Sequence, residues 1–169
     1  GLARRRVLFL LDGARLESDR RTGPNASFVS PEDIDQVEVL RSSSSVFYGS
    51  DAIGGVIHLL TRRPSFEPGV RGRLSMGYGF VNAEKSGGIR FEGASGRTAF
   101  LLSVQGRDAG NYHLPDGSPV RQSQYTQGSL LARISHRTDR RAVDLSFLGG
   151  RGLDIGKPNV TAETSPTWY

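Results

Sequence analysis

The residues that could carry out chemistry in this chain are few, and their spacing argues against a metal centre. The chain has three histidines and no cysteine, which excludes a disulfide framework, a Cys-ligated metal and a thiol nucleophile. His58, His113 and His136 fall in a predicted strand, loop and turn, and no pair has the spacing of metal ligands. We therefore predict no metal site and no cofactor.

Glycine, serine and acidic motifs also fall short of a catalytic or phosphate site. Gly54-Gly55 is followed by a β-branched strand and not by Lys-Ser/Thr and a helix, so it is not a phosphate-binding loop. Residues 49–51 lack the Gly-x-Ser-x-Gly pattern of a nucleophile elbow. The acids Glu32, Asp33 and Asp35 follow Ser30-Pro31, where a helix start explains them without a bound cation. We predict that the chain is not an enzyme.

The basic charge is spread too widely for a nucleic-acid site. The formal net charge is +5 and the sequence pI is about 10.1, which invites a polyanion partner. Residues 1–68 are balanced in charge, and residues 69–169 carry the whole excess. These charges alternate along predicted strands or lie in turns, and they do not cluster on a helix. We expect no nucleic-acid partner.

The second half of the sequence is a series of segments in which apolar and polar residues alternate. This period of two indicates β-strands with two different faces. One predicted face carries large apolar side chains: Leu74, Met76, Tyr78, Ile89, Phe91, Phe100, Leu102, Val104, Leu130, Ile134, Val143, Leu145 and Phe147. The opposite face carries polar side chains: Arg73, Arg90, Glu92, Gln105, Arg133, Asp144 and Ser146.

The alternation amounts to about five strands of roughly ten residues, the length that a tilted strand needs to cross a bilayer. Short connections alternate with one longer loop over about residues 108–123, as in outer-membrane barrels. No segment approaches the ~20 apolar residues of a membrane-spanning helix. Periodicity alone leaves two interpretations open, a transmembrane barrel or a soluble antiparallel sheet with one wet face.

The first half mixes short apolar runs with loops. Residues 7–11 read as a buried strand closed by the turn pair Asp12-Gly13. Residues 36–40 alternate again, and residues 56–60 form an apolar strand after Gly54-Gly55. Residues 64–69 separate the two halves.

The stretch from Ile34 to Pro64, IDQVEVLRSSSSVFYGSDAIGGVIHLLTRRP, closely resembles the C-terminal half of the plug domain of TonB-dependent receptors. Order, spacing and residue types agree over about thirty positions with the family pattern, and the upstream Leu10-Leu11-Asp12-Gly13 resembles the family's strand and turn. Two departures stand out. The family's Arg-Gly-Pro is Arg-Ser-Ser at residues 41–43, and the usual Asn after Val-Ile is His58.

The resemblance implies an α+β plug portion followed by antiparallel transmembrane β-barrel strands that leave the barrel open. Residues 1–66 would be the C-terminal half of the plug, and residues 67–169 the first strands of the barrel. The chain would then be a fragment of a longer protein in the outer membrane of a Gram-negative bacterium, with the plug on the concave polar side of the sheet.

The resemblance also implies a function and partners. The parent protein would import a scarce ligand, such as a ferric siderophore, haem or cobalamin. The inner membrane would supply energy through TonB, which binds an N-terminal box that lies outside this chain. Outer-membrane lipid would contact the apolar face of the barrel.

Residue roles follow from the resemblance and from the chemistry of each position. Residues expected to shape the plug are Asp12, Gly13, Tyr48, Gly49, Gly54 and Gly55. Glu38, Arg41 and Asp51 are expected on the plug surface against the polar barrel wall, with a local ion pair between Glu38 and Arg41. Tyr112 and His113 lie in the predicted external loop and could contact a ligand, although a solvated loop residue is the simpler explanation of His113.

Two other functions remain open. The same fold could import carbohydrate or peptide, or act in signalling, because the loops that set specificity are mostly outside this chain. A soluble β-rich module that binds polyanions is an alternative of another class. That module would interleave aromatic residues with clustered Lys and Arg on one face, whereas here the aromatic and aliphatic residues share one face and arginine takes the other.

Overall fold

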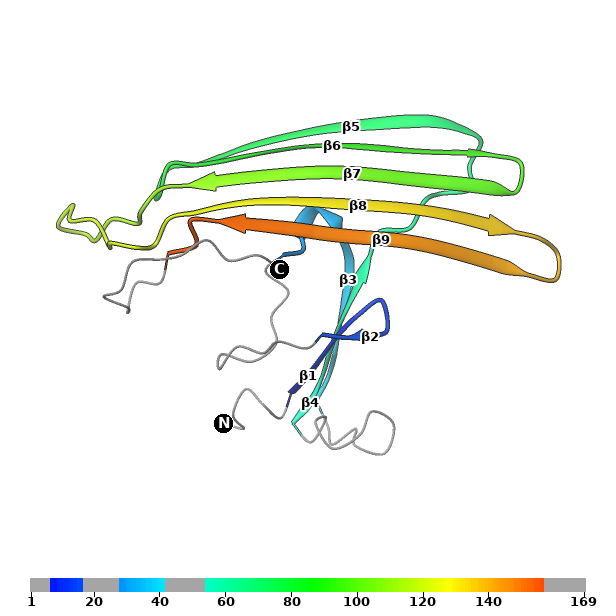
Figure 1. The fold of residues 1–169 in the computed structure, drawn as a ribbon, viewed down its shortest axis with the longest axis horizontal. Helices are drawn as coiled ribbons and strands as arrows, with labels where there is room; N and C mark the ends of the chain where they lie inside the picture. The colour runs from blue at the N-terminus through cyan, green and yellow to red at the C-terminus, as the bar shows by residue number, and fades with distance from the viewer. Residues whose placement is uncertain (1–6, 17–27, 42–53, 157–169) are drawn as a thin grey trace. The chain divides into compact units, whose positions relative to one another are not determined.

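The chain folds into two units. The computed structural model describes residues 7–16, 28–41 and 54–156 (Figure 1). The first unit comprises Gly1–Ser27 and Pro31–Arg63, and the second comprises Phe28–Ser30 and Pro64–Tyr169. Within the described ranges, no helix has the length and apolar character to cross a membrane.

The first unit is a small mixed sheet with the strand order β2-β1-β4-β3. Its strands are β1 (Val7–Leu11), β2 (Ala14–Arg15), β3 (Ile34–Leu40) and β4 (Gly55–Thr61). The predicted strands at residues 7–11, 36–40 and 56–60 are thus confirmed. β1 runs parallel to β4, whereas β3 pairs antiparallel with β4. Leu8, Leu10 and Val56 are buried together and form the core.

The predicted helix start at Ser30–Asp33 becomes a single turn of 3-10 helix, η2 (Pro31–Asp33). Proline at the first position and acids in the first turn suit any helical turn. The helix does not continue because Ile34 pairs with Thr61 and opens strand β3. A ladder with β4 therefore outweighs the local helical signal.

The second unit is an antiparallel sheet whose five strands are neighbours in the order of the sequence. They are β5 (Gly69–Gly79), β6 (Glu84–Ser95), β7 (Thr98–Ala109), β8 (Tyr125–Arg137) and β9 (Ala142–Leu153). Each strand has 11 to 13 residues, which confirms the predicted number and approximate length. β5 and β9 are the edges of this sheet within the described residues (Figure 1), so the barrel is not closed.

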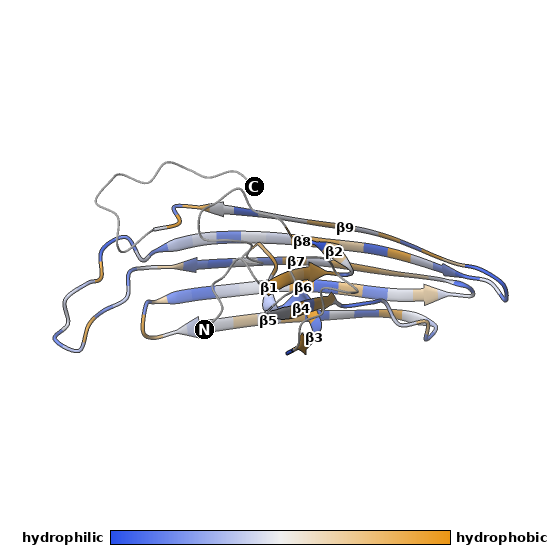
Figure 2. Cartoon of the chain, turned by 90° about the horizontal axis from the view of Figure 1, so that it is seen from below, coloured by the Kyte–Doolittle hydropathy of each residue, from blue (hydrophilic) through white to orange (hydrophobic). Residues whose placement is uncertain are grey.

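The predicted division into two faces is confirmed by the register of the strands. Phe91, Leu102, Ala132 and Phe147 form one continuous row across β6 to β9. The next row, on the opposite face, contains Glu92, Leu101, Arg133 and Ser146. Figure 2 shows the alternation of polar and apolar residues along the strands.

Large hydrophobic side chains are exposed on one face of this sheet only. Met76 is 81% exposed, Leu145 67% and Phe147 60%. On the other face, Leu101 and Leu131 are buried, and so is Arg133 at 4% exposure. This arrangement is the reverse of a water-soluble sheet, in which the apolar face is covered.

Connections differ in length between the two ends of the sheet (Figure 1). Residues 96–97 and 138–141 make tight turns at one end. Residues 80–83 and the long loop 110–124 lie at the other end, where the amide of Gly110 donates to the carbonyl of Asn82 at 2.9 Å. The predicted short and long connections are thus both present, and the turns of the short end follow directly after β6 and β8, which end at Ser95 and Arg137.

Candidate functional site

The Asp12-Gly13 turn of the first unit is tied to strand β4 by hydrogen bonds. The backbone amide of Thr61 donates to Asp12 Oδ1 at 2.8 Å, and its hydroxyl donates to Oδ2 at 2.6 Å. Both turn residues have positive φ, 48° at Asp12 and 86° at Gly13. Glycine accepts this conformation without cost and Asp tolerates it. The turn pair therefore fixes the end of β1 against β4.

His58 links the same turn to strand β3. The amide of Gly13 donates to His58 Nε2 at 2.9 Å, and Nδ1 lies 3.3 Å from Glu38 Oε2. An amide can only donate, so Nε2 carries no proton in this arrangement, and Nδ1–H donates to Glu38. Gln36 Nε2 donates to the other oxygen of Glu38 at 3.2 Å. His58 thus bridges a backbone amide and a carboxylate.

The residues predicted on the plug surface are only partly described. Glu38 is exposed and bonds to His58 and Gln36. Arg41 is exposed just after β3, and within residues 28–41 and 54–63 no ion pair joins it to Glu38. Asp51 lies outside the described residues, as do Tyr48 and Gly49. The role of these residues against the barrel wall stays a prediction.

Gly55 occupies a position that only glycine suits. Its φ is 125°, a backbone conformation that L side chains rarely adopt. A Cβ atom there would overlap the carbonyl oxygen of Leu40 on β3. Close approach of β3 and β4 therefore depends on this glycine. Gly54 precedes it, outside the strand.

A cluster of charged and phenolic side chains occupies the loop end of the polar face of the second unit. Glu84 begins β6, Arg107 lies near the end of β7 and Tyr125 begins β8. Arg107 Nη2 lies 3.0 Å from Glu84 Oε1. The hydroxyl of Tyr125 donates to Glu84 Oε2 at 2.8 Å. One carboxylate therefore joins three neighbouring strands.

Loop 110–124 continues directly from this cluster. The side-chain oxygen of Asn111 accepts from the amides of Ser123 and Gln124 at 2.9 and 3.2 Å. The hydroxyl of Ser123 in turn accepts from the amide of Tyr112 at 2.9 Å. These bonds close the base of the loop at the ends of β7 and β8.

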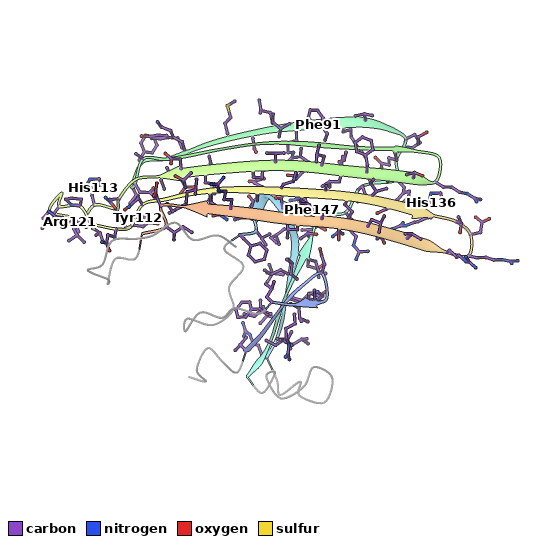
Figure 3. The ribbon with its side chains drawn as sticks, viewed as in Figure 1. Phe91, Tyr112, His113, Arg121, His136 and Phe147 are labelled. Atoms are coloured by element: carbon purple, nitrogen blue, oxygen red, sulfur yellow. The ribbon has the colours of Figure 1, made fainter. Side chains whose placement is uncertain are left out.

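Tyr112 and His113, the predicted ligand contacts, lie in the first part of this loop (Figure 3). Both side chains are exposed, and His113 forms a bridge with Pro119. The loop tip is a turn at Asp116, whose carboxylate accepts from the hydroxyl and the amide of Ser118 at 2.6 and 2.9 Å. These hydrogen bonds, the hydroxyl first, hold the pKa of Asp116 below its ordinary value. Ligand contact by Tyr112 or His113 stays a prediction.

Charged side chains occupy the opposite end of the sheet, where the two tight turns lie. Arg97 Nη2 lies 3.1 and 3.2 Å from the two oxygens of Asp139, joining the two tight turns. The guanidinium of Arg137 lies 4.3 Å from the centre of the Phe66 ring, a cation–π distance. His136 shares a 2.9 Å hydrogen bond with Thr98. The Arg97–Asp139 contact thus joins the two tight turns.

No metal centre is built by the part of the chain that the structure describes: no three His, Asp or Glu side chains there are grouped to hold an ion. The sequence-based reasoning missed the cluster of Glu84, Arg107 and Tyr125. The alternation along the strands places each of them on the polar face. Their proximity, however, depends on the cross-strand register, which the turn lengths set.

Comparison with known proteins agrees with both units. Residues 1–56 match the model of the TonB-dependent Receptor Plug Domain. The hemin receptor of Yersinia enterocolitica is 32% identical over 98% of this chain and 25% of its own length. The vitamin B12 transporter BtuB of Vibrio vulnificus is 29% identical over 82% of this chain and 22% of its own length. The chain thus spans about a quarter of the length of these relatives.

A solved structure resembles the fold. The crystal structure of the siderophore receptor PirA from Pseudomonas aeruginosa superposes with a TM-score of 0.64 at 21% identity, over 88% of this chain and 27% of the other. This likeness supports the fold alone. The plug-domain match and the hemin receptor, which aligns with 98% of this chain, show that the chain belongs to the TonB-dependent receptors of the Gram-negative outer membrane, with plug-domain sequence followed by strands of the β-barrel.

Proposed function

We propose that the protein containing this chain imports a scarce ligand across the outer membrane, with TonB supplying energy from the inner membrane. The candidate ligands are haem, a ferric siderophore and cobalamin. The relatives named for hemin and vitamin B12 support this class. Haem is the first ligand to test because the hemin receptor matches over 98% of the chain.

The observation that carries the proposal is the exposed apolar face of the second unit. Burial of one large hydrophobic side chain contributes about 1.5–3 kcal/mol, and this face leaves many of them uncovered. A contiguous apolar patch of this kind indicates a membrane or a partner surface. On a barrel the same face contacts lipid, and the polar face lines the lumen.

The plug and its surface residues complete the proposed mechanism. A barrel of about 22 strands leaves a lumen that a plug must fill. We propose that Glu38, Arg41 and Asp51 contribute polar contacts to the lumen wall, as the family resemblance implies. Movement of the plug under the pull of TonB would then open a path for the ligand.

Uptake with and without TonB tests the proposal. The receptor is expressed in a host that lacks other uptake routes, and the probes are hemin, ferric enterobactin and cyanocobalamin. We expect one probe to bind in both strains and to enter only cells that contain TonB. Entry at the same rate without TonB, or no binding of any probe, would contradict the proposal.

A further inference from the structure

Glycine and serine make up most of the two cross-strand rows at Arg107, with Gln105 and Gln127 as the larger members. The row of Arg107 itself contains Gly77, Ser86, Gln127 and Gly152. The next row toward the tight turns contains Ser75, Gly88, Gln105, Ser129 and Gly150. The Arg107 side chain is 35% exposed. The Arg107 side chain is therefore partly open on the polar face.

The guanidinium is oriented on one side and retains donors on the other. A guanidinium has five N–H donors in a planar fork, and Nη2 is the atom that approaches Glu84. Both oxygens of Glu84 are engaged, one by Arg107 and one by the hydroxyl of Tyr125. Glu84 therefore anchors the guanidinium at Nη2 and does not use all of its donors.

A planar cation held in this way suits a planar anion. Carboxylates bind guanidinium groups through two parallel N–H···O bonds, and orientation before binding lowers the entropic cost. The cluster also lies at the end of the sheet that carries loop 110–124. In this loop Tyr112 (Figure 3) and Leu114 expose apolar surface. A ligand with both an apolar body and a carboxylate matches these two features.

We propose that Arg107, positioned by Glu84 and Tyr125, binds a carboxylate of the imported ligand. This inference rests on the proposed uptake function and narrows its ligand class. The ligand we test is haem, whose propionates supply the carboxylates. The competing explanation is a purely structural clamp that ties β6, β7 and β8 together.

Hemin and its dimethyl ester separate the two explanations, because esterification removes the carboxylates and keeps the macrocycle. The complete receptor is purified from outer membranes, and the Kd of each probe is measured by absorbance titration. The variants are Arg107→Gln and Arg107→Lys, the second of which keeps the charge and loses the fork. The matched control is Arg97→Gln, which removes an exposed arginine paired with an acid at the opposite end of the sheet. Heat-modifiable gel migration checks the fold of every variant.

We expect wild type to bind hemin about tenfold or more tighter than the ester. Arg107→Gln should abolish that difference by weakening hemin alone, Arg107→Lys should restore part of it, and Arg97→Gln should leave it unchanged. Equal weakening of both probes by Arg107→Gln, or no weakening, would overturn the carboxylate assignment. A receptor that binds cyanocobalamin or ferric enterobactin and not hemin would also overturn it, while leaving the uptake function intact. If none of the probes bound to the receptor, both the carboxylate assignment and the proposed uptake function would be contradicted.

Discussion

At the scale of single residues, His58 has a role that the sequence did not reveal. The family resemblance marked it only as a departure from the usual Asn, because its partners come from two distant segments. Gly13 and Glu38 reach it only once β4 lies between β1 and β3. Similarly, Glu38 was expected beside Arg41, yet the antiparallel register places it directly opposite His58.

Replacement of His58 by alanine should loosen the Asp12-Gly13 turn. The Gly13 amide loses its acceptor, and one such bond contributes about 0.5–1.5 kcal/mol. We expect exchange of the Gly13 amide hydrogen in the complete receptor to accelerate about three- to tenfold. His58→Asn, the usual residue of the family, should keep part of the protection if its amide oxygen reaches Gly13.

Gln36→Ala is the matched control for this experiment, because it removes the neighbouring bond to Glu38 and leaves Gly13 untouched. Hydrogen exchange followed by mass spectrometry reports on the turn in each variant. Equal protection of Gly13 in wild type and His58→Ala would show that the His58 bond does not hold the turn.

Gly55→Ala should be the more damaging substitution in the first unit. The added Cβ meets Leu40 O on β3 and the φ of 125° is strained for alanine, which together cost on the order of 1–3 kcal/mol. We expect faster hydrogen exchange across β3 and less folded receptor in the membrane. Gly106→Ala is the control, since its nearest neighbour would lie 4.0 Å away. Equal rates of hydrogen exchange in Gly55→Ala and Gly106→Ala would show that close packing at Gly55 does not stabilise the pairing of β3 with β4.

At the scale of elements, the strands were predictable because apolar and polar residues alternate along each of them. The length, number and faces of β5 to β9 follow directly from that alternation. The short length of the 3-10 turn at Pro31–Asp33 was not predictable. An N-cap residue followed by acidic residues indicates a single helical turn as well as it indicates a full helix. The cluster of Glu84, Arg107 and Tyr125 could not be predicted from the sequence either, because the identity of cross-strand neighbours depends on the lengths of the turns.

A matched pair of substitutions on β9 tests the two faces. Ser146 and Phe147 are adjacent and both exposed, and they lie on opposite faces of the sheet. Phe147→Arg places a charge in the middle of the apolar face, which costs about 2–4 kcal/mol near the bilayer midplane. Ser146→Arg places it in the polar lumen at little cost. We expect only Phe147→Arg to lower the amount of assembled, heat-modifiable barrel.

The reverse order, or equal loss from both variants, would contradict lipid contact by the apolar face. In a water-soluble sheet with this face uncovered, Phe147→Arg would raise solubility. The pair therefore separates the membrane assignment from a general intolerance of arginine in β9.

At the scale of the whole molecule, the two units have different kinds of surface. The first unit has a small apolar core within a mixed sheet. The second exposes apolar side chains on one face, and its described strands end in the open edges β5 and β9. Open edges are not tolerated in lipid, so we predict that β5 and β9 pair with further strands when the sheet lies in the membrane.

The most direct test of this account is the location of the complete receptor in the cell. Its membranes are separated into inner and outer fractions, and the protein is run on gels with and without heating. We predict that it is found in the outer-membrane fraction and that unheated protein migrates as a compact, heat-modifiable barrel. Recovery in the soluble fraction, with migration that heating does not change, would contradict the membrane assignment and with it the proposed uptake.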